Sequence, residues 1–318
     1  MAGPAPRTVL VTGCSSGIGL AVAVRLAQDP QRRFQVIATM RDLSKKGKLE
    51  EAAGPALGKT LSIQRLDVCS DSSVAECLSS VPGGRVDVLV NNAGVGHVGP
   101  VESISVEEMK RVFETNFFGA VRMIKAVLPE MKRRRSGHIV VVSSVMGLQG
   151  IVFNDVYAAS KFAVEGFCES GALRIPRRRR GHGALLQGRL PAGLPRDLHH
   201  AGAEPGGRGR GARRTGMGRG TRFGATPSGR PLAPRGSGGS LRPQAMASVI
   251  GAQRPAFRTQ TNGLYTPLVA LKYADPSGDL SVRTYYRLLF HYGTLFHLSM
   301  AVLRCLTCGC FRRRIAPL

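Results

Sequence analysis

Short apolar segments alternate with longer amphipathic ones through the first half of the chain, and this alternation constrains the fold more than any other feature. The apolar segments at 8–12, 34–39, 61–68, 86–90 and 138–142 have the length of strands. Amphipathic stretches at about 17–28 and 106–133, and one that ends near 170, have the length of helices. Such alternation is typical of a parallel sheet with helices on both faces. We therefore predict an α/β fold, a doubly wound parallel sheet in a single domain whose core covers residues 5–171.

The alternation stops at residue 172. Residues 172–242 contain 16 Arg but no Lys, Val, Tyr or Asn, and their two acidic residues are Asp197 and Glu204. Gly, Ala, Arg and Pro dominate, and neither a helical nor a strand periodicity is found. A segment of this composition buries too little apolar surface to offset the entropy lost on ordering. We therefore expect it to be disordered, and we assign to it much of the net charge of +25.

Two further segments follow. Residues 243–284 are predicted to return to ordered structure, with a helix near residue 245, as a remnant of a C-terminal substrate region. Residues 285–318 form an apolar and basic tail that contains cysteines. The apolar part of the tail is interrupted by charged and polar residues, so an interfacial helix fits it better than a span of about 20 apolar residues. Cys305, Cys308 and Cys310 lie beside basic residues and are candidates for palmitoylation at a membrane. An unmodified, disordered end is the alternative, and no zinc site is predicted because a fourth ligand is missing nearby.

Cysteine usage and the N-terminus indicate the compartment. Seven cysteines at irregular spacings argue against a disulfide framework and favour a reducing compartment. The first seven residues form a short, Pro-rich segment that does not have the pattern of a signal peptide. We expect a cytoplasmic protein that associates with membranes through its tail.

A glycine-rich turn, Thr12-Gly-Cys-Ser-Ser-Gly-Ile-Gly19, follows the first expected strand. Its glycines permit a tight turn, and the N-terminus of the helix behind them would accept a pyrophosphate. A strand, a glycine turn and a helix in this order are typical of a Rossmann-type sheet, although a plain strand-to-helix turn is the alternative. The candidate cofactor contacts in this turn are Gly13, Ser15, Ser16, Gly17, Ile18 and Gly19.

Tyr157 and Lys161 are four residues apart on an expected helix, so their side chains share one face. A free tyrosine titrates near pH ~10, and a close positive charge lowers that pKa. A phenol tuned in this way can pass a proton to or from a substrate oxygen near neutral pH. The pair alone is weak evidence, because the spacing arises by chance on ordinary helices.

Together with the glycine turn, Asn91-Asn-Ala-Gly94, Ser144 and Tyr157-x-x-x-Lys161 stand in the order and spacing of the short-chain dehydrogenase/reductase family, which the chain resembles over about residues 5–170. Further runs are similar to the branch that contains the 17β-hydroxysteroid and the photoreceptor retinol dehydrogenases. These runs are Cys14-Ser-Ser16, Ala38-Thr-Met-Arg-Asp42, Asn116-Phe-Phe-Gly-Ala120 and Phe153-Asn-Asp-Val-Tyr157. The run Ser144-Val-Met-Gly-Leu-Gln-Gly150 and the Cys-x-x-Cys-Gly-Cys tail favour the retinol enzymes.

The resemblance implies a role for each of four catalytic residues. Tyr157 is the general acid in carbonyl reduction and the general base in alcohol oxidation, and Lys161 holds the cofactor ribose and lowers the pKa of the tyrosine. Ser144 binds the substrate oxygen and stabilises the charge that grows there. Asn116 connects a water-linked proton path to the lysine, provided that its helix is kinked. Each of two roles has an alternative. Ser144 could only cap the segment that follows it, and Asn116 could only hydrogen-bond to backbone groups.

Charge at the end of the second strand indicates the cofactor. An acid at this place accepts hydrogen bonds from the ribose hydroxyls of NAD, whereas an arginine can pair with the 2′-phosphate of NADP. Arg41, helped by the hydroxyls of Ser15 and Ser16, favours NADP (NADPH); Asp42 favours NAD, and Arg41 as a solvated surface charge is the alternative. Outside the glycine turn, the resemblance implies that the cofactor contacts Asp67, Val68, Asn92, Ala93, Gly94, Tyr157 and Lys161. A role of Asp67 as a loop cap alone is the alternative.

In this family a sixth strand follows the tyrosine helix and ends in a Pro-Gly turn over the nicotinamide, and a substrate-binding segment comes next. Residues 172–242 stand at this place, so we expect them to replace the sixth strand and the substrate loop. Their composition agrees with translation in a wrong reading frame, because GC-rich DNA read out of frame encodes Gly, Ala, Arg and Pro. A basic insert that binds nucleic acid is the rival, but Phe223 is the one aromatic residue of the segment, so nucleic acid is not the expected partner.

The resemblance implies an oxidoreductase that interconverts all-trans-retinal and all-trans-retinol with NADP, its substrate being a bulky, apolar retinoid or steroid. One alternative is a 17β-hydroxysteroid dehydrogenase acting on estradiol and estrone. The other is a catalytically impaired cofactor-binding protein, because the floor under the nicotinamide would be missing. The oligomeric state stays open, a homodimer included.

Overall fold

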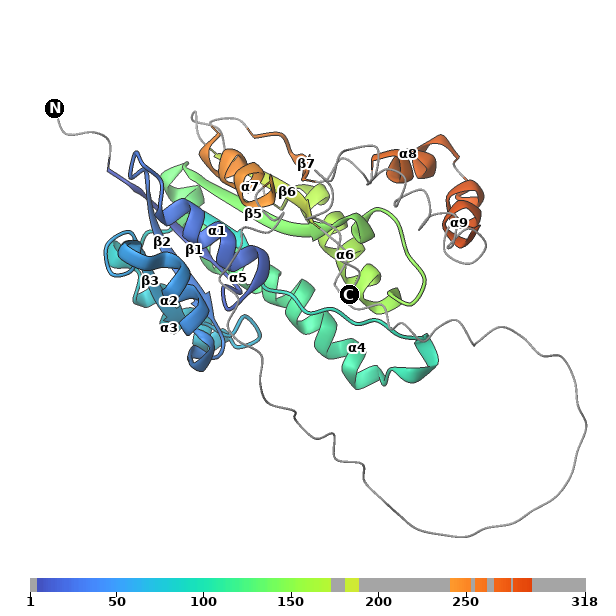
Figure 1. Cartoon of the computed structure of the whole chain (residues 1–318), viewed down its shortest axis with the longest axis horizontal. Helices are drawn as coiled ribbons and strands as arrows, with labels where there is room; N and C mark the ends of the chain where they lie inside the picture. Colours follow the sequence, from blue (N-terminus) through green and yellow to red (C-terminus); the bar gives the residue numbers. More distant parts are fainter. Residues whose placement is uncertain are drawn as a thin grey trace, which may run out of the picture.

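The computed structural model describes residues 5–172, 181–188, 241–252, 255–261, 266–275 and 277–287. Seven parallel strands form one sheet in the order β3-β2-β1-β4-β5-β6-β7 (Figure 1). The strands are β1 (Arg7–Val11), β2 (Phe34–Met40), β3 (Leu61–Arg65), β4 (Val88–Asn91), β5 (Gly137–Ser144), β6 (Gly181–Gly188) and β7 (Arg258–Gln260). The order runs outward from β1 in both directions, which confirms the predicted doubly wound α/β fold.

Nine α-helices are described alongside the sheet. They are α1 (Gly17–Ala27), α2 (Gly47–Ala53), α3 (Asp71–Ser79), α4 (Val106–Phe113), α5 (Gly119–Arg134), α6 (Asp155–Phe167), α7 (Leu241–Gly251), α8 (Thr266–Ala274) and α9 (Asp279–Tyr286). The helix expected near residue 245 is therefore present as α7, beside α1 on the same face of the sheet (Figure 1).

Each face of the sheet has its own apolar layer. Val9 and Val11 point into the layer covered by α1, α2 and α7, whereas Leu10 between them points into the layer covered by α3, α5 and α6. Side chains of a strand alternate between its faces, so a strand buried on both sides must be apolar at every position. This explains why the strands in the middle of the sheet, such as β4, appear in the sequence as nearly continuous apolar runs.

The helix expected over residues 106–133 is present but is not regular. Ser105 starts it with a capping box, in which its hydroxyl accepts from the Glu108 amide and the Glu108 carboxylate accepts from the Ser105 amide. Between α4 and α5 the residues Glu114–Phe118 form a π-helical turn. A π-turn inserts one residue into a helix and is frequent at functional sites.

The expectation that residues 172–242 replace the sixth strand is wrong in one part. β6 lies inside that segment and pairs with the whole of β5, from Gly137 opposite Gly181 to Ser144 opposite Gly188. Parallel pairing uses backbone groups that every residue except proline carries, and residues 181–188 contain no proline. Pairing at the edge of β5 therefore does not require the side-chain alternation that we looked for.

Several sequence predictions fall on residues that the structure does not describe. For residues 173–180 and 189–240 we predicted disorder or a wrong reading frame. For the tail from residue 288 onward we predicted membrane association and the palmitoylation of Cys305, Cys308 and Cys310. Within the described part of the chain, no helix is both long and apolar enough to cross a membrane.

Candidate active site

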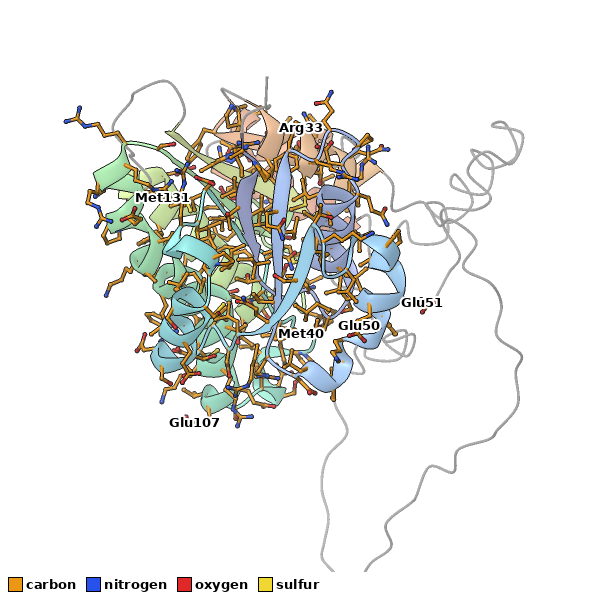
Figure 2. All side chains as sticks on the ribbon, turned by 90° about the vertical axis from the view of Figure 1, so that its left-hand side faces the viewer. Arg33, Met40, Glu50, Glu51, Glu107 and Met131 are labelled. Atoms are coloured by element: carbon orange, nitrogen blue, oxygen red, sulfur yellow. The ribbon has the colours of Figure 1, made fainter. Side chains whose placement is uncertain are left out.

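The candidate site residues come together at the carboxyl-terminal edge of the sheet. In Figure 2, Met40 at the end of β2 and Glu107 in α4 lie toward this edge, and Arg33, which precedes β2, lies at the opposite one. The glycine turn follows β1, Asn92 to Gly94 follow β4, and Ser144 ends β5. In an open parallel sheet, ligands bind in the crevice outside the carboxyl ends of the strands.

The glycine turn is packed directly against the segment that follows β4. The Thr12 hydroxyl accepts hydrogen bonds from the amides of Asn92 (3.0 Å) and Ala93 (2.9 Å). The Asn92 side chain donates to the carbonyls of Thr12 (2.9 Å) and Gly13 (3.0 Å). A Cβ added to Gly19 would lie 2.3 Å from the Gly13 carbonyl oxygen and 2.4 Å from Asn92 Nδ2. The close approach therefore requires glycine at position 19.

The N-terminus of α1 is open toward the same edge. Gly13 (φ 72°) and Gly17 (φ 62°) turn the chain into the helix in the left-handed region, which glycine adopts without strain. Ser16 is the N-cap residue, and its side chain makes no capping hydrogen bond. The amides of the first helical turn, with the hydroxyls of Ser15 and Ser16 beside them, are therefore suited to bind phosphate groups.

Arg41 is exposed directly after β2. The neighbouring Asp42 is already engaged, because its carboxylate accepts from the Ser44 amide (3.0 Å) and hydroxyl (2.7 Å) and lies 3.6 Å from Lys45. Hydrogen bonds from Ser44 hold the pKa of Asp42 below its ordinary value. The carboxylate that would suit the ribose of NAD therefore caps its own turn, whereas the guanidinium of Arg41 extends into solvent.

Asp67 and Val68 lie in the loop after β3. The Asp67 carboxylate accepts from the Cys69 amide at 3.0 Å, so the loop-cap alternative describes this side chain correctly. Arg122 of α5, which the sequence analysis did not single out, donates to the Val68 carbonyl at 2.7 Å and pairs with Asp71. Its third partner is Glu114 in the π-helical turn, so one guanidinium connects the loop after β3 to that turn. An isolated arginine on a helix gives no sequence signal of this connection.

Asn116 lies in the π-helical turn and is buried. Its Oδ1 accepts from the Val95 amide (2.8 Å), and its Nδ2 donates to the Val95 carbonyl (2.9 Å) and to Ser160 Oγ (3.0 Å). A Cβ on Gly94 would lie 3.2 Å from Asn116 Oδ1 and 3.8 Å from Lys161 Nζ. Asn116 therefore joins the segment after β4 to α6, and it does so from a π-helical turn.

Ser144 and Tyr157 form the polar pair at the end of β5. Both are buried, and the Ser144 hydroxyl lies near enough to Tyr157 to lower the pKa of its phenol. Ser144 Oγ also accepts from the Met146 amide at 3.2 Å, so it caps the turn that follows β5 and contacts Tyr157 at the same time. Two hydroxyls in contact can both hydrogen-bond to one carbonyl or alcohol oxygen.

Lys161 lies on the same face of α6 as Tyr157, as predicted. Its ammonium donates to the Val142 carbonyl at 3.0 Å and lies 5.7 Å from the centroid of the Tyr157 ring. Burial lowers the pKa of Lys161 to about 8, an effect that the charge of Glu165 opposes. A lysine with this pKa exchanges protons near neutral pH.

The pKa of Tyr157 differs from the sequence expectation. Burial raises it above the ordinary value, and the hydrogen bond with Ser144 opposes this effect. The physical reason is that the protein interior disfavours a phenolate, while the Lys161 ammonium is directed to Val142. In this structure Ser144, and not Lys161, is therefore the group that lowers the tyrosine pKa.

Helix α8 covers the flank of this site, and it lies in the segment 243–284 that was expected to be a remnant of the C-terminal substrate region. Val269 packs in one apolar cluster with Tyr157, Met146 and Leu148. Lys272 donates to the Leu148 carbonyl at 2.6 Å and lies 4.5 Å from the Phe162 ring centroid. This helix is about 110 residues from Tyr157 in sequence, so local patterns could not reveal the contact.

Two other features lie outside the site. A cavity of about 410 Å³ is lined by residues such as Arg25, Asp29, Arg33, Gln244 and Ser248, at the amino-terminal edge of the sheet and away from Tyr157. Among the residues that the structure describes, no group of three or more His, Cys, Asp or Glu is placed to hold a metal ion.

Comparison with known proteins identifies the family. The model of the short chain dehydrogenase family matches residues 7–179. Retinol dehydrogenase 8 from Bos taurus is 53% identical over 327 residues, which cover 98% of this chain and 99% of that protein. 17-beta-hydroxysteroid dehydrogenase type 1 from Homo sapiens is 52% identical over 173 residues, 54% of this chain and 53% of that protein.

Solved structures agree with this assignment. A short-chain dehydrogenase from Streptomyces avermitilis, 23% identical, superimposes with a TM-score of 0.60 over 92% of this chain and 98% of its own, which supports the fold. The closed form of serine dehydrogenase complexed with NADP+ is 32% identical, with a TM-score of 0.50 over 57% of this chain and 71% of its own. The chain therefore belongs to the short-chain dehydrogenase family and is an oxidoreductase.

Proposed function

We propose that the chain is an NADP-dependent oxidoreductase that interconverts all-trans-retinal and all-trans-retinol, with Tyr157 as the proton donor and acceptor. The observation that carries this proposal is the contact of Tyr157 with Ser144 in a buried site that also holds the Lys161 ammonium. The retinoid is supported by the match to retinol dehydrogenase 8, which extends over 98% of the chain.

The nicotinamide cofactor, when bound, supplies the hydride for reduction of the carbonyl carbon or accepts it from the alcohol. In reduction, the Tyr157 hydroxyl donates its proton to the carbonyl oxygen as negative charge grows there. The Ser144 hydroxyl donates a hydrogen bond to the same oxygen and stabilises that charge. In oxidation the same groups act in reverse, and Tyr157 accepts the proton of the alcohol.

Lys161 and Asn116 support Tyr157. The Lys161 ammonium lies beside the tyrosine ring and is suited to bind the hydroxyls of the cofactor ribose and to return a proton toward Tyr157. Asn116 holds α6 through Ser160, whose hydroxyl donates to the Tyr157 carbonyl at 2.7 Å. This connection fixes the tyrosine relative to the segment 92–95, which supports a proton path beside the lysine.

The residues present fit an NADP molecule. The glycine turn leaves no room for a side chain at Gly19, and the first amides of α1 can bind its pyrophosphate. Arg41 is exposed and can pair with the 2′-phosphate, and Asp42 is occupied by its own turn. Asp67, Val68, Asn92, Ala93 and Gly94 would contact the rest of the cofactor.

A steady-state assay tests the proposal. The full chain is incubated with NADPH and either all-trans-retinal or estrone, and Tyr157→Phe serves as the control. Retinal reduction that falls about 10²–10⁴-fold in Tyr157→Phe is expected, while NADPH binding is retained. Turnover of estrone in preference to retinal would support a 17β-hydroxysteroid dehydrogenase, which the match to that protein favours. NADPH binding without any turnover would support a cofactor-binding protein, and turnover that Tyr157→Phe leaves unchanged would contradict the mechanism.

We also propose a cytoplasmic protein that binds membranes through residues 285–318, with the homodimer as one of the assemblies left open. Co-sedimentation with vesicles, compared with a chain ending at residue 284, tests the first expectation. Light scattering of the purified chain tests the second.

A further inference from the structure

Glu165 is a buried carboxylate in the middle of the catalytic helix α6. Its side chain is 4% exposed, and it lies one helical turn after Lys161, on the same face. Gly147 packs closely against this side chain, since a Cβ added to Gly147 would lie 2.8 Å from Glu165 Cγ. A buried ionised carboxylate is unfavourable unless a cation neutralises it. Lys161 is the neighbouring cation on this helix face, so its own interactions depend on which cation neutralises Glu165.

Arg258, the first residue of β7, pairs with this carboxylate. Its Nη2 and Nε donate to Glu165 Oε2 at 2.8 Å and 3.3 Å, and Nη2 also pairs with Glu169 in the turn after α6. The partners Arg258 and Glu165 are 93 residues apart in sequence. One arginine thus connects the last strand of the sheet to the helix that carries Tyr157 and Lys161.

The ammonium of Lys161 is directed elsewhere. It donates to the Val142 carbonyl of β5 and lies beside the Tyr157 ring. We propose that Arg258 is a positioning residue of the active site: by holding the carboxylate of Glu165, it keeps Lys161 oriented toward Val142 and Tyr157 instead of toward Glu165. This inference rests on the proposed catalytic role of Lys161.

The charged and titratable groups around Lys161 make the consequence measurable. On its own helix these groups are Tyr157 and Glu165; the π-helical turn contributes the neutral Asn116, β5 the Val142 carbonyl, and β7 Arg258 through Glu165. The Coulombic attraction of Glu165 raises the pKa of Lys161 against the larger effect of burial. Loss of Arg258 leaves Lys161 as the cation nearest to Glu165 on α6, which raises the lysine pKa, and loss of the Glu165 charge lowers it.

Titration of Lys161 by NMR tests the inference without turnover. The full chain is labelled at lysine Cε and Nζ, and the Lys161 signal is identified by its loss in Lys161→Arg. Arg258→Gln should raise the pKa of Lys161 by roughly one unit, and Glu165→Gln should lower it. Glu169→Gln is the matched control, because it removes the exposed partner of Arg258 and retains the buried pair; it should leave Lys161 unchanged. Identical titration of Lys161 in the wild-type chain and in Arg258→Gln would overturn the inference.

The pH dependence of kcat/KM for retinal reduction, measured in parallel, separates this inference from the proposed function. The alkaline limb should move with the lysine pKa, upward in Arg258→Gln and downward in Glu165→Gln. Shifts seen by NMR without any movement of the pH profile would contradict the role of Lys161 in catalysis and leave the positioning by Arg258 intact. If Arg258→Gln does not fold, Arg258→Lys and Glu165→Gln replace it. A smaller rise of the Lys161 pKa in Arg258→Lys and a fall of that pKa in Glu165→Gln support the inference. An unchanged Lys161 pKa in either variant overturns it.

Discussion

The side-chain amide of Asn116 donates to the hydroxyl of Ser160 at 3.0 Å, across 44 residues of sequence. Ser160 in turn donates to the Tyr157 carbonyl at 2.7 Å, one turn earlier on α6. The π-helical turn and the catalytic helix are therefore held together by neutral hydrogen bonds in the interior. Each such bond adds little to the net stability of the fold. When one partner is removed, however, the fold loses the full desolvation energy of the buried group that remains.

Replacement of Asn116 by Ala should reduce stability by about 2–4 kcal/mol, because it leaves both backbone groups of Val95 without their side-chain partner. Turnover should fall as well, since the segment 92–95 loses its attachment to α6. Ser160→Ala is the matched change: it removes the hydrogen bonds of Ser160 with Asn116 Nδ2 and with the Tyr157 carbonyl but leaves Val95 paired, and it should reduce stability by about 1 kcal/mol. Urea unfolding and kcat measure both. Equal stability losses in the two variants would contradict this account.

Gly19→Ala should abolish cofactor binding and destabilise the fold. The added Cβ would meet the Gly13 carbonyl and Asn92 Nδ2 at 2.3 and 2.4 Å, and both atoms are held by the packing of two loops. Gly166→Ala in α6 serves as the control, because nothing lies within 4 Å of its Cβ and the position is exposed. It should gain about 0.5–1 kcal/mol, since alanine favours helices more than glycine does. Fluorescence titration with NADPH and thermal unfolding compare the two.

Lys161→Met should make the protein more stable and inactive. The folded-state pKa of about 8 lies below the ordinary value of 10.5, so burial of the ammonium opposes folding. This penalty is complete below pH 8 and disappears above pH 10.5, because the lysine is then neutral in both states. At pH 7 we expect a gain of roughly 1–3 kcal/mol, after the lost hydrogen bond to Val142 is subtracted.

Urea unfolding of Lys161→Met and of the wild-type chain at pH 7 and at pH 10.5 checks the sign. The difference between the two proteins should shrink at the higher pH. A difference that grows with pH, or a variant less stable than wild type at pH 7, would show that burial does not disfavour the ammonium.

Arg41→Ala should weaken the binding of NADPH by about 1–2 kcal/mol and leave NADH nearly unaffected, because the lost guanidinium interacts with the 2′-phosphate alone. The effect should decrease at high salt, since Arg41 is exposed. Lys59→Ala removes an equally exposed charge before β3, at the opposite edge of the sheet, and should change neither cofactor. KM values for both cofactors settle the comparison, and equal losses for NADPH and NADH in Arg41→Ala would refute the assignment.

Strands β2, β4 and β5 could be predicted because they are largely buried on both faces and appear as mainly apolar runs, whereas β3 at the edge of the sheet is half-buried. The third was predicted to extend to residue 68 but ends at Arg65, since Asp67 turns back to accept from the Cys69 amide. The closeness of Tyr157 and Lys161 followed from helical geometry alone. The contact of Tyr157 with Ser144 depended on the order of motifs, which places both at one edge of the sheet.

Other features could not be found in this way. A π-helical turn keeps the side-chain pattern of a helix, so the one inserted residue around Asn116 leaves no periodic signal. β6 is held by backbone pairing with β5, and its residues lack the alternation by which strands are recognised. The pairs of Arg258 with Glu165 and of Arg122 with Glu114 depend on tertiary packing, because charge alone does not reveal which partner a side chain reaches.

The pair of Arg258 and Glu165 also has a consequence for the order in which the chain is made. Residue 167 ends the catalytic helix, but the arginine that neutralises Glu165 is synthesised 93 positions after that glutamate. At ~5–20 residues per second, on the order of ten seconds pass between the two on the ribosome. During that interval the nascent helix carries an acid without its β7 arginine and a sheet whose last edge is incomplete. A chain stalled before residue 258 therefore lacks both the β7 strand that pairs with β6 and the arginine that pairs with Glu165.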